Sequence, residues 1–266
     1  MGQRCAGNVS PMSRHRPYSG MLAAAGLLIV GWSTAIAQPA DGKGKRPVVV
    51  ELYTSQGCSS CPPADVFLGQ LATRKDVLAV SLPVTYWDML GWRDTLASES
   101  NTRRQKAYAR ELGRGGVYTP EMIVDGASDV VGSRTQAVEA AIAARASDMQ
   151  AVPVEIEANR QQIHIAVGSA PDRGQRDATI WLFGILPQAT VSIGDGENSG
   201  RTITYHNVVR EIRSIGTWKG QPVSVNMSRA EAGPPHDGIA VVVQQGGYGR
   251  VLGAALMDRP NFYLAR

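Results

Sequence analysis

Hydrophobic runs and helical patterns alternate along the first part of the chain. Continuous apolar and β-branched runs at Val48–Tyr53 and Val77–Val84 predict two buried strands. Between them, Pro62-Pro63 suits a helix start, and Phe67, Leu68 and Leu71 follow at helical spacing. The polar segment Thr95–Leu112 predicts an exposed helix. This alternation is typical of an α/β fold.

A hairpin and a closing helix follow. Asp125-Gly126 is a tight-turn signal between the short apolar run Met122–Val124 and its predicted hairpin partner, Asp129–Val131. The segment Ala137–Ala146 then predicts a helix. The order strand, helix, strand, helix, strand, strand, helix predicts a small α/β sandwich over residues 38–150.

From Ala151 onward the pattern changes, and apolar and polar residues alternate along short segments. Val154–Glu157 and Ile163–Val167 alternate apolar and polar positions around a polar turn. Further strands are predicted at 178–185, 201–212, 221–226, 239–244 and 251–257. Residues 151–266 therefore predict an all-β, sandwich-like domain, with a domain boundary near residue 150.

The N-terminus has the features of a secretory signal peptide. Three arginines precede the apolar run Met21–Trp32, and Ala35-Ile36-Ala37 gives a small-x-small cleavage pattern. The run is short for a bilayer span, although an uncleaved anchor is the alternative. We therefore expect a signal peptide over residues 1–37, a periplasmic or secreted bacterial protein, and no stable membrane span after its removal.

Composition and charge exclude a disordered chain and narrow the classes of partner that the protein can bind. The chain has 266 residues, is 43% hydrophobic, and has a formal net charge of +4, so it is not a disordered chain. Without the leader's three arginines, 24 basic residues face 23 acidic ones. A nearly neutral chain without a basic run gives no reason to expect nucleic acid as a partner.

The number and spacing of the cysteines indicate a redox role. Cys5 leaves with the leader, so the mature chain keeps only Cys58 and Cys61. A disulfide across so small a loop stabilises weakly, which makes redox exchange a better reason for the pair. Cys58 is expected at the N-terminus of the helix, where a thiolate is favoured, and it would attack a substrate disulfide. Cys61 would resolve the resulting mixed disulfide.

A second element is expected opposite the cysteines. Thr119-Pro120 stands directly before a predicted strand. A cis bond there would present the Thr119 backbone beside the sulfurs and dock an extended substrate. An ordinary trans turn proline is the alternative. Thr119 and Pro120 are therefore the predicted substrate groove.

These elements together resemble the thioredoxin fold. More narrowly, the segment Glu51–Asp65, with the sequence ELYTSQGCSSCPPAD, is similar to an exported thioredoxin-like family known as domain of unknown function 1223. The similarity continues through five further motifs: Tyr86-Trp87-Asp88, Leu90-Gly91-Trp92, Arg104-Gln105, Val117–Pro120 and Val124-Asp125-Gly126. The resemblance implies a thioredoxin-like fold with a redox centre and no settled substrate. Gly57 and Ser59-Ser60 depart from the tryptophan and Gly-Pro usual in thioredoxins.

Three further side chains are candidates for the site. Glu51 is the acid nearest to the position where thioredoxins keep a buried proton acceptor, and a solvated or salt-bridged carboxylate is the alternative. Trp87 and Asp88 follow the second strand, at the edge where such folds place their sites. They are candidates for a site wall, and core packing is the alternative for the tryptophan.

The expected activity is thiol–disulfide exchange on a protein or on a small thiol or disulfide, with no cofactor. The alternative is a non-catalytic binding module, with an inert disulfide or with copper(I) held by the two thiolates. Zinc would need two more ligands, and His164, His206 and His236 are isolated in the sequence. We therefore predict no metal site, and the chain is either a thiol–disulfide oxidoreductase or a binding protein.

Overall fold

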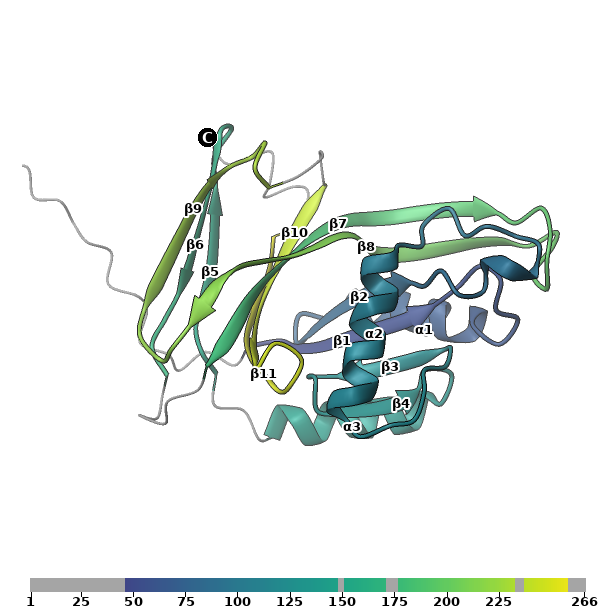
Figure 1. Cartoon of the computed structure of the whole chain (residues 1–266), viewed down its shortest axis with the longest axis horizontal. Coiled ribbons are helices and arrows are strands. Elements are labelled where there is room, and N and C mark those ends of the chain that lie inside the picture. The colour runs from purple at the N-terminus through teal and green to yellow at the C-terminus, as the bar shows by residue number, and fades with distance from the viewer. Residues whose placement is uncertain (1–45, 148–150, 171–176, 233–236, 258–266) are drawn as a thin grey trace, which may run out of the picture. The chain divides into compact units, whose positions relative to one another are not determined.

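The computed structural model describes residues 46–147, 151–170, 177–232 and 237–257. The expected signal peptide, Cys5 and His236 lie outside the described residues. Within the described ranges, no helix has the length and apolarity needed to cross a bilayer. The chain from residue 38 onward groups into one compact unit, and its described residues form two β-sheets and three α-helices (Figure 1).

The larger sheet has eight strands in the order β11-β10-β7-β8-β2-β1-β3-β4. Its first half contains β1 (Val48–Thr54), β2 (Val77–Pro83), β3 (Glu121–Val124) and β4 (Ser128–Val131). β1 runs parallel to β2, whereas β3 is antiparallel to both β1 and β4. β1 and β2 are buried along their whole length, which explains their continuous apolar runs.

Helices cover both faces of this half of the sheet. α1 (Pro62–Leu71) and α3 (Thr135–Ser147) share a core with the even-numbered residues of β1, such as Val50 and Leu52. α2 (Glu99–Glu111) packs through Tyr108 against the face that carries Val49 and Tyr53. The side chains of one strand thus alternate between two helix layers.

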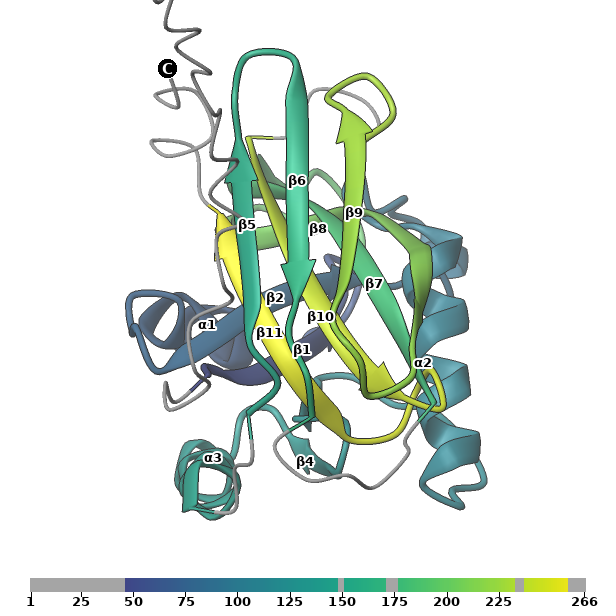
Figure 2. The ribbon, with the colours of Figure 1, turned by 90° about the vertical axis from the view of Figure 1, so that its left-hand side faces the viewer.

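The described residues after α3 form strands and no helix. β7 (Ala178–Ser192) and β8 (Thr202–Trp218) make a long antiparallel hairpin, and β10 (Gly238–Gln245) and β11 (Val251–Met257) extend the sheet beyond β7. β5 (Val154–Ala158), β6 (Gln162–Val167) and β9 (Val223–Ser228) form a separate sheet. Figure 2 shows this sheet packed in front of β7, β10 and β11. Ile163 and Ile165 lie in the apolar core between the two layers.

The two halves of the chain share one sheet and one core. β2 pairs with β8 in parallel at Ser81 and Val208, so the large sheet continues across the predicted boundary near residue 150. Leu78 and Val80 of the first half pack in the same cluster as Phe183 of the second. The mixed α/β class is confirmed. The predicted boundary falls in the connection between α3 and β5.

Candidate functional site

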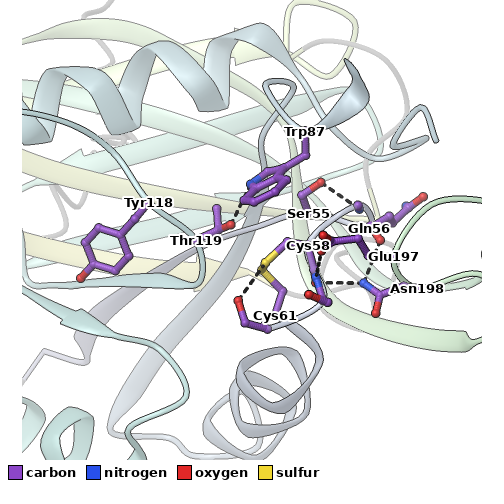
Figure 3. Close-up of a disulfide and its surroundings, with 12 residues drawn as sticks. Ser55, Gln56, Cys58, Cys61, Trp87, Tyr118, Thr119, Glu197 and Asn198 are labelled. Atoms are coloured by element: carbon purple, nitrogen blue, oxygen red, sulfur yellow. Dashed lines mark hydrogen bonds between the residues drawn. A yellow bond between two sulfur atoms is a disulfide. The ribbon is translucent and has the colours of Figure 1, made fainter. Parts of the chain in front are cut away.

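The cysteine pair lies between a buried strand and a helix, as predicted. β1 ends at Thr54, a short turn follows, and α1 begins at Pro62. Cys58 and Cys61 are joined by a disulfide, with their Cα atoms 5.4 Å apart (Figure 3). The amide of Cys61 donates to the carbonyl of Cys58 at 3.2 Å, which closes the turn between them. Both cysteines are buried, whereas Ser59 and Ser60 are exposed.

The relation of Cys58 to the helix differs from the prediction. Cys61 is the N-cap of α1, so Cys58 lies in the turn before the helix and not in its first turn. Pro62 and Pro63 occupy the first two helical positions and have no N–H group. The amide of Ala64 donates to the carbonyl of Cys61 at 2.9 Å. A thiolate at Cys58 would therefore depend on the groups of its own turn, among them the Ser60 hydroxyl, whose oxygen lies 3.4 Å from the Cys58 sulfur.

The predicted substrate groove lies beside this turn. The Thr119–Pro120 peptide bond is cis, as expected from the sequence. The Trp87 indole N–H donates to the Thr119 hydroxyl at 2.8 Å. A Cβ atom added at Gly57 would lie 3.2 Å from the Cβ of Trp87. Trp87 thus stands between the proline loop and the cysteine loop, consistent with a site wall (Figure 3).

Asp88 follows β2, as expected, and its side chain hydrogen-bonds within its own loop. It begins the short 3-10 helix η1 (Asp88–Leu90), and its carboxylate accepts a hydrogen bond from the amide of Asp94 at 3.1 Å. Asp94 in turn accepts from the amide of Gln56 at 2.8 Å. Trp92 donates its indole N–H to the Gln56 side chain at 2.8 Å. Asp88 and Trp92 therefore hold the loop that leads into the cysteines.

The turn between β7 and β8, far away in sequence, completes the site. The buried Asn198 amide group donates to the carbonyls of Gln56 and Cys58, both at 2.9 Å. The exposed Glu197 carboxylate accepts from the amide of Ser59 at 3.1 Å. Hydrogen bonding to Ser59 lowers the pKa of Glu197. The sequence contains no signal for this contact, because a polar turn has the same composition wherever it docks.

Asp65 is a buried acid that the sequence analysis missed. It stands four residues after Cys61 on α1, so both side chains lie on the same side of the helix. Burial raises the pKa of Asp65 well above its usual range. Neither carboxylate oxygen has a hydrogen-bond partner among the described residues, and the same holds for the nearby Tyr205 hydroxyl. The sequence did contain a signal for Asp65, because an acid on the apolar face of a predicted helix indicates a buried carboxylate.

Glu51, the predicted proton acceptor, faces away from the cysteines. It lies on the α2 side of β1, whereas α1 covers the opposite face. Its carboxylate is paired with the buried Arg104 at 2.7 and 2.8 Å and accepts from the hydroxyls of Tyr53 and Tyr108. The structure therefore favours the alternative of a salt-bridged carboxylate. Side chains alternate between the two faces of a strand, and this alternation places Glu51 on the face of β1 that α2 covers.

A groove with a volume of about 810 Å³ lies beside α1. It runs between α1 and the first residues of β8, and Pro62, Val66, Thr204 and His206 contribute to its lining. The described residues contain no cluster of three or more histidine, cysteine or carboxylate side chains that could hold a metal ion.

Comparisons with known proteins agree with one another. A crystal structure of a protein from Agrobacterium tumefaciens matches with a TM-score of 0.72 and 31% identity, over 84% of this chain and 99% of the other. HBP35 of Porphyromonas gingivalis matches with a TM-score of 0.59 and 11% identity, over 84% of this chain and 78% of the other, which shows a likeness of fold alone. No curated protein matches the sequence.

The sequence profile of one family matches most of the structured chain. This family is described as a protein of unknown function, DUF1223, and the match runs over residues 49–244. The matched range includes the cysteine turn, the cis-proline loop and the β7–β8 turn that docks on them. The chain therefore belongs to the DUF1223 family.

Proposed function

We propose that the protein is a thiol–disulfide exchange protein that acts through Cys58 and Cys61 on a thioredoxin-like half. The observation that carries the proposal is the disulfide at the start of α1, beside the loop with the cis Thr119–Pro120 bond. The strand order β2-β1-β3-β4, with β1 parallel to β2 and β3 antiparallel to its neighbours, supports a thioredoxin-like fold.

The exchange moves two electrons between the pair and a substrate. In the reduced protein, the Cys58 thiolate attacks one sulfur of a substrate disulfide, forms a mixed disulfide and releases one substrate thiolate. The Cys61 thiolate then attacks the Cys58 sulfur, re-forms the Cys58–Cys61 bond and releases the second substrate thiolate. The substrate is reduced and the protein oxidised, and the same steps in reverse oxidise a dithiol.

A polypeptide substrate is favoured by the surface next to Trp87. Met89 and Leu90, which follow it, are 85% and 45% exposed. Exposed apolar side chains beside a site are typical of surfaces that bind protein segments. The groove residues Thr119 and Pro120 would align such a segment beside the sulfurs.

The burial of the sulfurs supports a second candidate function. Cys58 and Cys61 are 1% and 0% exposed, so a substrate sulfur reaches Cys58 only after the covering groups move. A locked disulfide in a binding module, or a copper(I) carrier, needs no such access. The two functions differ in whether Cys58 ever bonds covalently to a partner.

Trapping the mixed disulfide tests the proposal. Cys61→Ala should accumulate a covalent adduct with a partner thiol, because no resolving thiol remains, whereas Cys58→Ala should accumulate far less. The readout is a mobility shift that disappears on reduction, in an extract treated with a thiol-blocking agent. Equal, background adducts in both variants would contradict exchange. Stoichiometric copper(I) binding that is lost in either variant would support the carrier.

We also propose export to the periplasm or the medium, on the basis of the predicted signal peptide. Oxidising conditions there suit a disulfide between Cys58 and Cys61. Fractionation of a producing bacterium, with mass analysis of the mature N-terminus, checks this. Full-length protein in the cytoplasm would contradict it.

A further inference from the structure

The β7–β8 turn is fixed on the backbone of the cysteine loop. Asn198 is fully buried, and its amide group donates to the carbonyls of Gln56 and Cys58, both at 2.9 Å. These two bonds anchor the turn on either side of the first cysteine. Figure 3 shows Glu197 and Asn198 together beside Cys58.

This anchoring brings a negative charge to the first cysteine. The Glu197 carboxylate accepts from the amide of Ser59 at 3.1 Å, and this amide belongs to the peptide unit that begins with the carbonyl carbon of Cys58. The carboxylate is thus hydrogen-bonded to the peptide unit that joins Cys58 to Ser59, and it occupies the N–H group of that unit.

One side-chain donor is available to a thiolate at Cys58, the Ser60 hydroxyl, whose oxygen lies 3.4 Å from the Cys58 sulfur. The first two residues of α1, Pro62 and Pro63, have no N–H group. The amide of Cys61 already donates to the carbonyl of Cys58. A thiolate gains stability from backbone amides and from nearby positive charge, and here one amide is taken by a carboxylate.

We propose that Glu197 lowers the reduction potential of the Cys58–Cys61 pair and thereby biases it toward the disulfide. The inference rests on the redox role proposed above. The disulfide is neutral, whereas the reduced pair carries a thiolate that the Glu197 carboxylate repels. The carboxylate therefore destabilises the reduced form more than the oxidised one. Glu197 acts through the Ser59 amide and is a positioning residue.

The equilibrium constant with dithiothreitol measures this bias. Two thiols of the reagent give two electrons and two protons to the disulfide, and the reagent becomes its own cyclic disulfide. Glu197→Gln keeps the shape and removes the charge, so the reduced fraction should rise, with the constant larger by about three- to tenfold. The thiolate absorbance of the reduced protein at neutral pH should rise as well. One molar salt should shrink the difference between the variants, since the carboxylate is exposed.

Asp195 provides a matched control on the same turn. Its carboxylate accepts from the amide of Gly196 and makes no hydrogen bond with the described cysteine loop. Asp195→Asn removes the same charge from the chain, so it should change the constant by less than about twofold. An equal rise of the equilibrium constant in both variants would show that only the net charge of the chain matters, and it would overturn a specific role for Glu197.

Asn198→Ala tests the anchoring. Without its two bonds the turn is no longer held on the loop, so the constant should approach that of Glu197→Gln, and the double variant should add nothing further. Unchanged constants in Glu197→Gln and in Asn198→Ala, with folded protein by circular dichroism, would overturn the inference. Such a result leaves the exchange function intact, because that function is tested separately by covalent trapping with Cys61→Ala.

Discussion

The buried ion pair between Glu51 and Arg104 should make the stability of the folded chain sensitive to the loss of either partner. Arg104 is 2% exposed and donates to both oxygens of Glu51, at 2.7 and 2.8 Å. It also donates to Gln244 at 2.9 Å, and its guanidinium lies over the rings of Trp181 and Phe183. The pair therefore connects α2 and β1 with strands of the second half.

Removal of one partner leaves the other charge buried. Arg104→Met leaves the carboxylate with the hydroxyls of Tyr53 and Tyr108 alone, and Glu51→Gln leaves the buried guanidinium with neutral partners and no carboxylate. Each change should lower the free energy of unfolding by about 3–5 kcal/mol. In the double variant no charge is buried and the two hydroxyls keep an acceptor. Its loss should be smaller than the sum of the single losses by at least about 2 kcal/mol.

Urea unfolding of the oxidised protein, followed by circular dichroism, measures these losses. Arg103→Met, on the exposed side of α2, is the control and should stay within about 0.5 kcal/mol of the unchanged protein. Single losses below about 1 kcal/mol, or additive losses in the double variant, would refute the reasoning. Glu51→Gln should leave the exchange constant with dithiothreitol unchanged, because Glu51 faces α2. A changed constant would restore Glu51 as a candidate at the redox site.

Three further predictions concern Asp65, Gly126 and Trp87. Burial raises the folded-state pKa of Asp65, so the contribution of Asp65 to stability falls as pH rises above about 4. The melting temperature of Asp65→Asn should therefore rise relative to that of the unchanged protein as pH increases. A difference in melting temperature that stays constant with pH would contradict this. Gly126 has a φ of 64°, and an added methyl group would overlap the backbone of the β10–β11 turn. Gly126→Ala should therefore lower the free energy of unfolding in urea by about 2 kcal/mol or more. Gly115→Ala is the control and should cause no such loss, because there is open space around Gly115. Trp87→Phe removes the hydrogen bond to Thr119 and should lose about 1 kcal/mol in the same assay; no loss would show that the bond is replaced by water.

Local patterns in the sequence determined the first half well. Continuous apolar runs predicted β1 and β2, and Asp125-Gly126 predicted the β3–β4 turn, because both signals act within a few residues. The two cysteines and Thr119-Pro120 were found for the same reason, since short motifs carry them. The family was identified from such motifs as well.

The tertiary structure alone decided what surrounds these motifs. The direction of Glu51 depends on the register of β1 in the sheet, and its pairing with Arg104 depends on how α2 packs. The docking of Glu197 and Asn198 on the cysteine loop spans about 140 residues. No local pattern encodes a contact of this range, because a polar turn is equally stable in solvent and against another loop. The sequence therefore determined where the cysteine pair and Thr119-Pro120 lie along the chain, and the fold decided which charged side chains lie beside them.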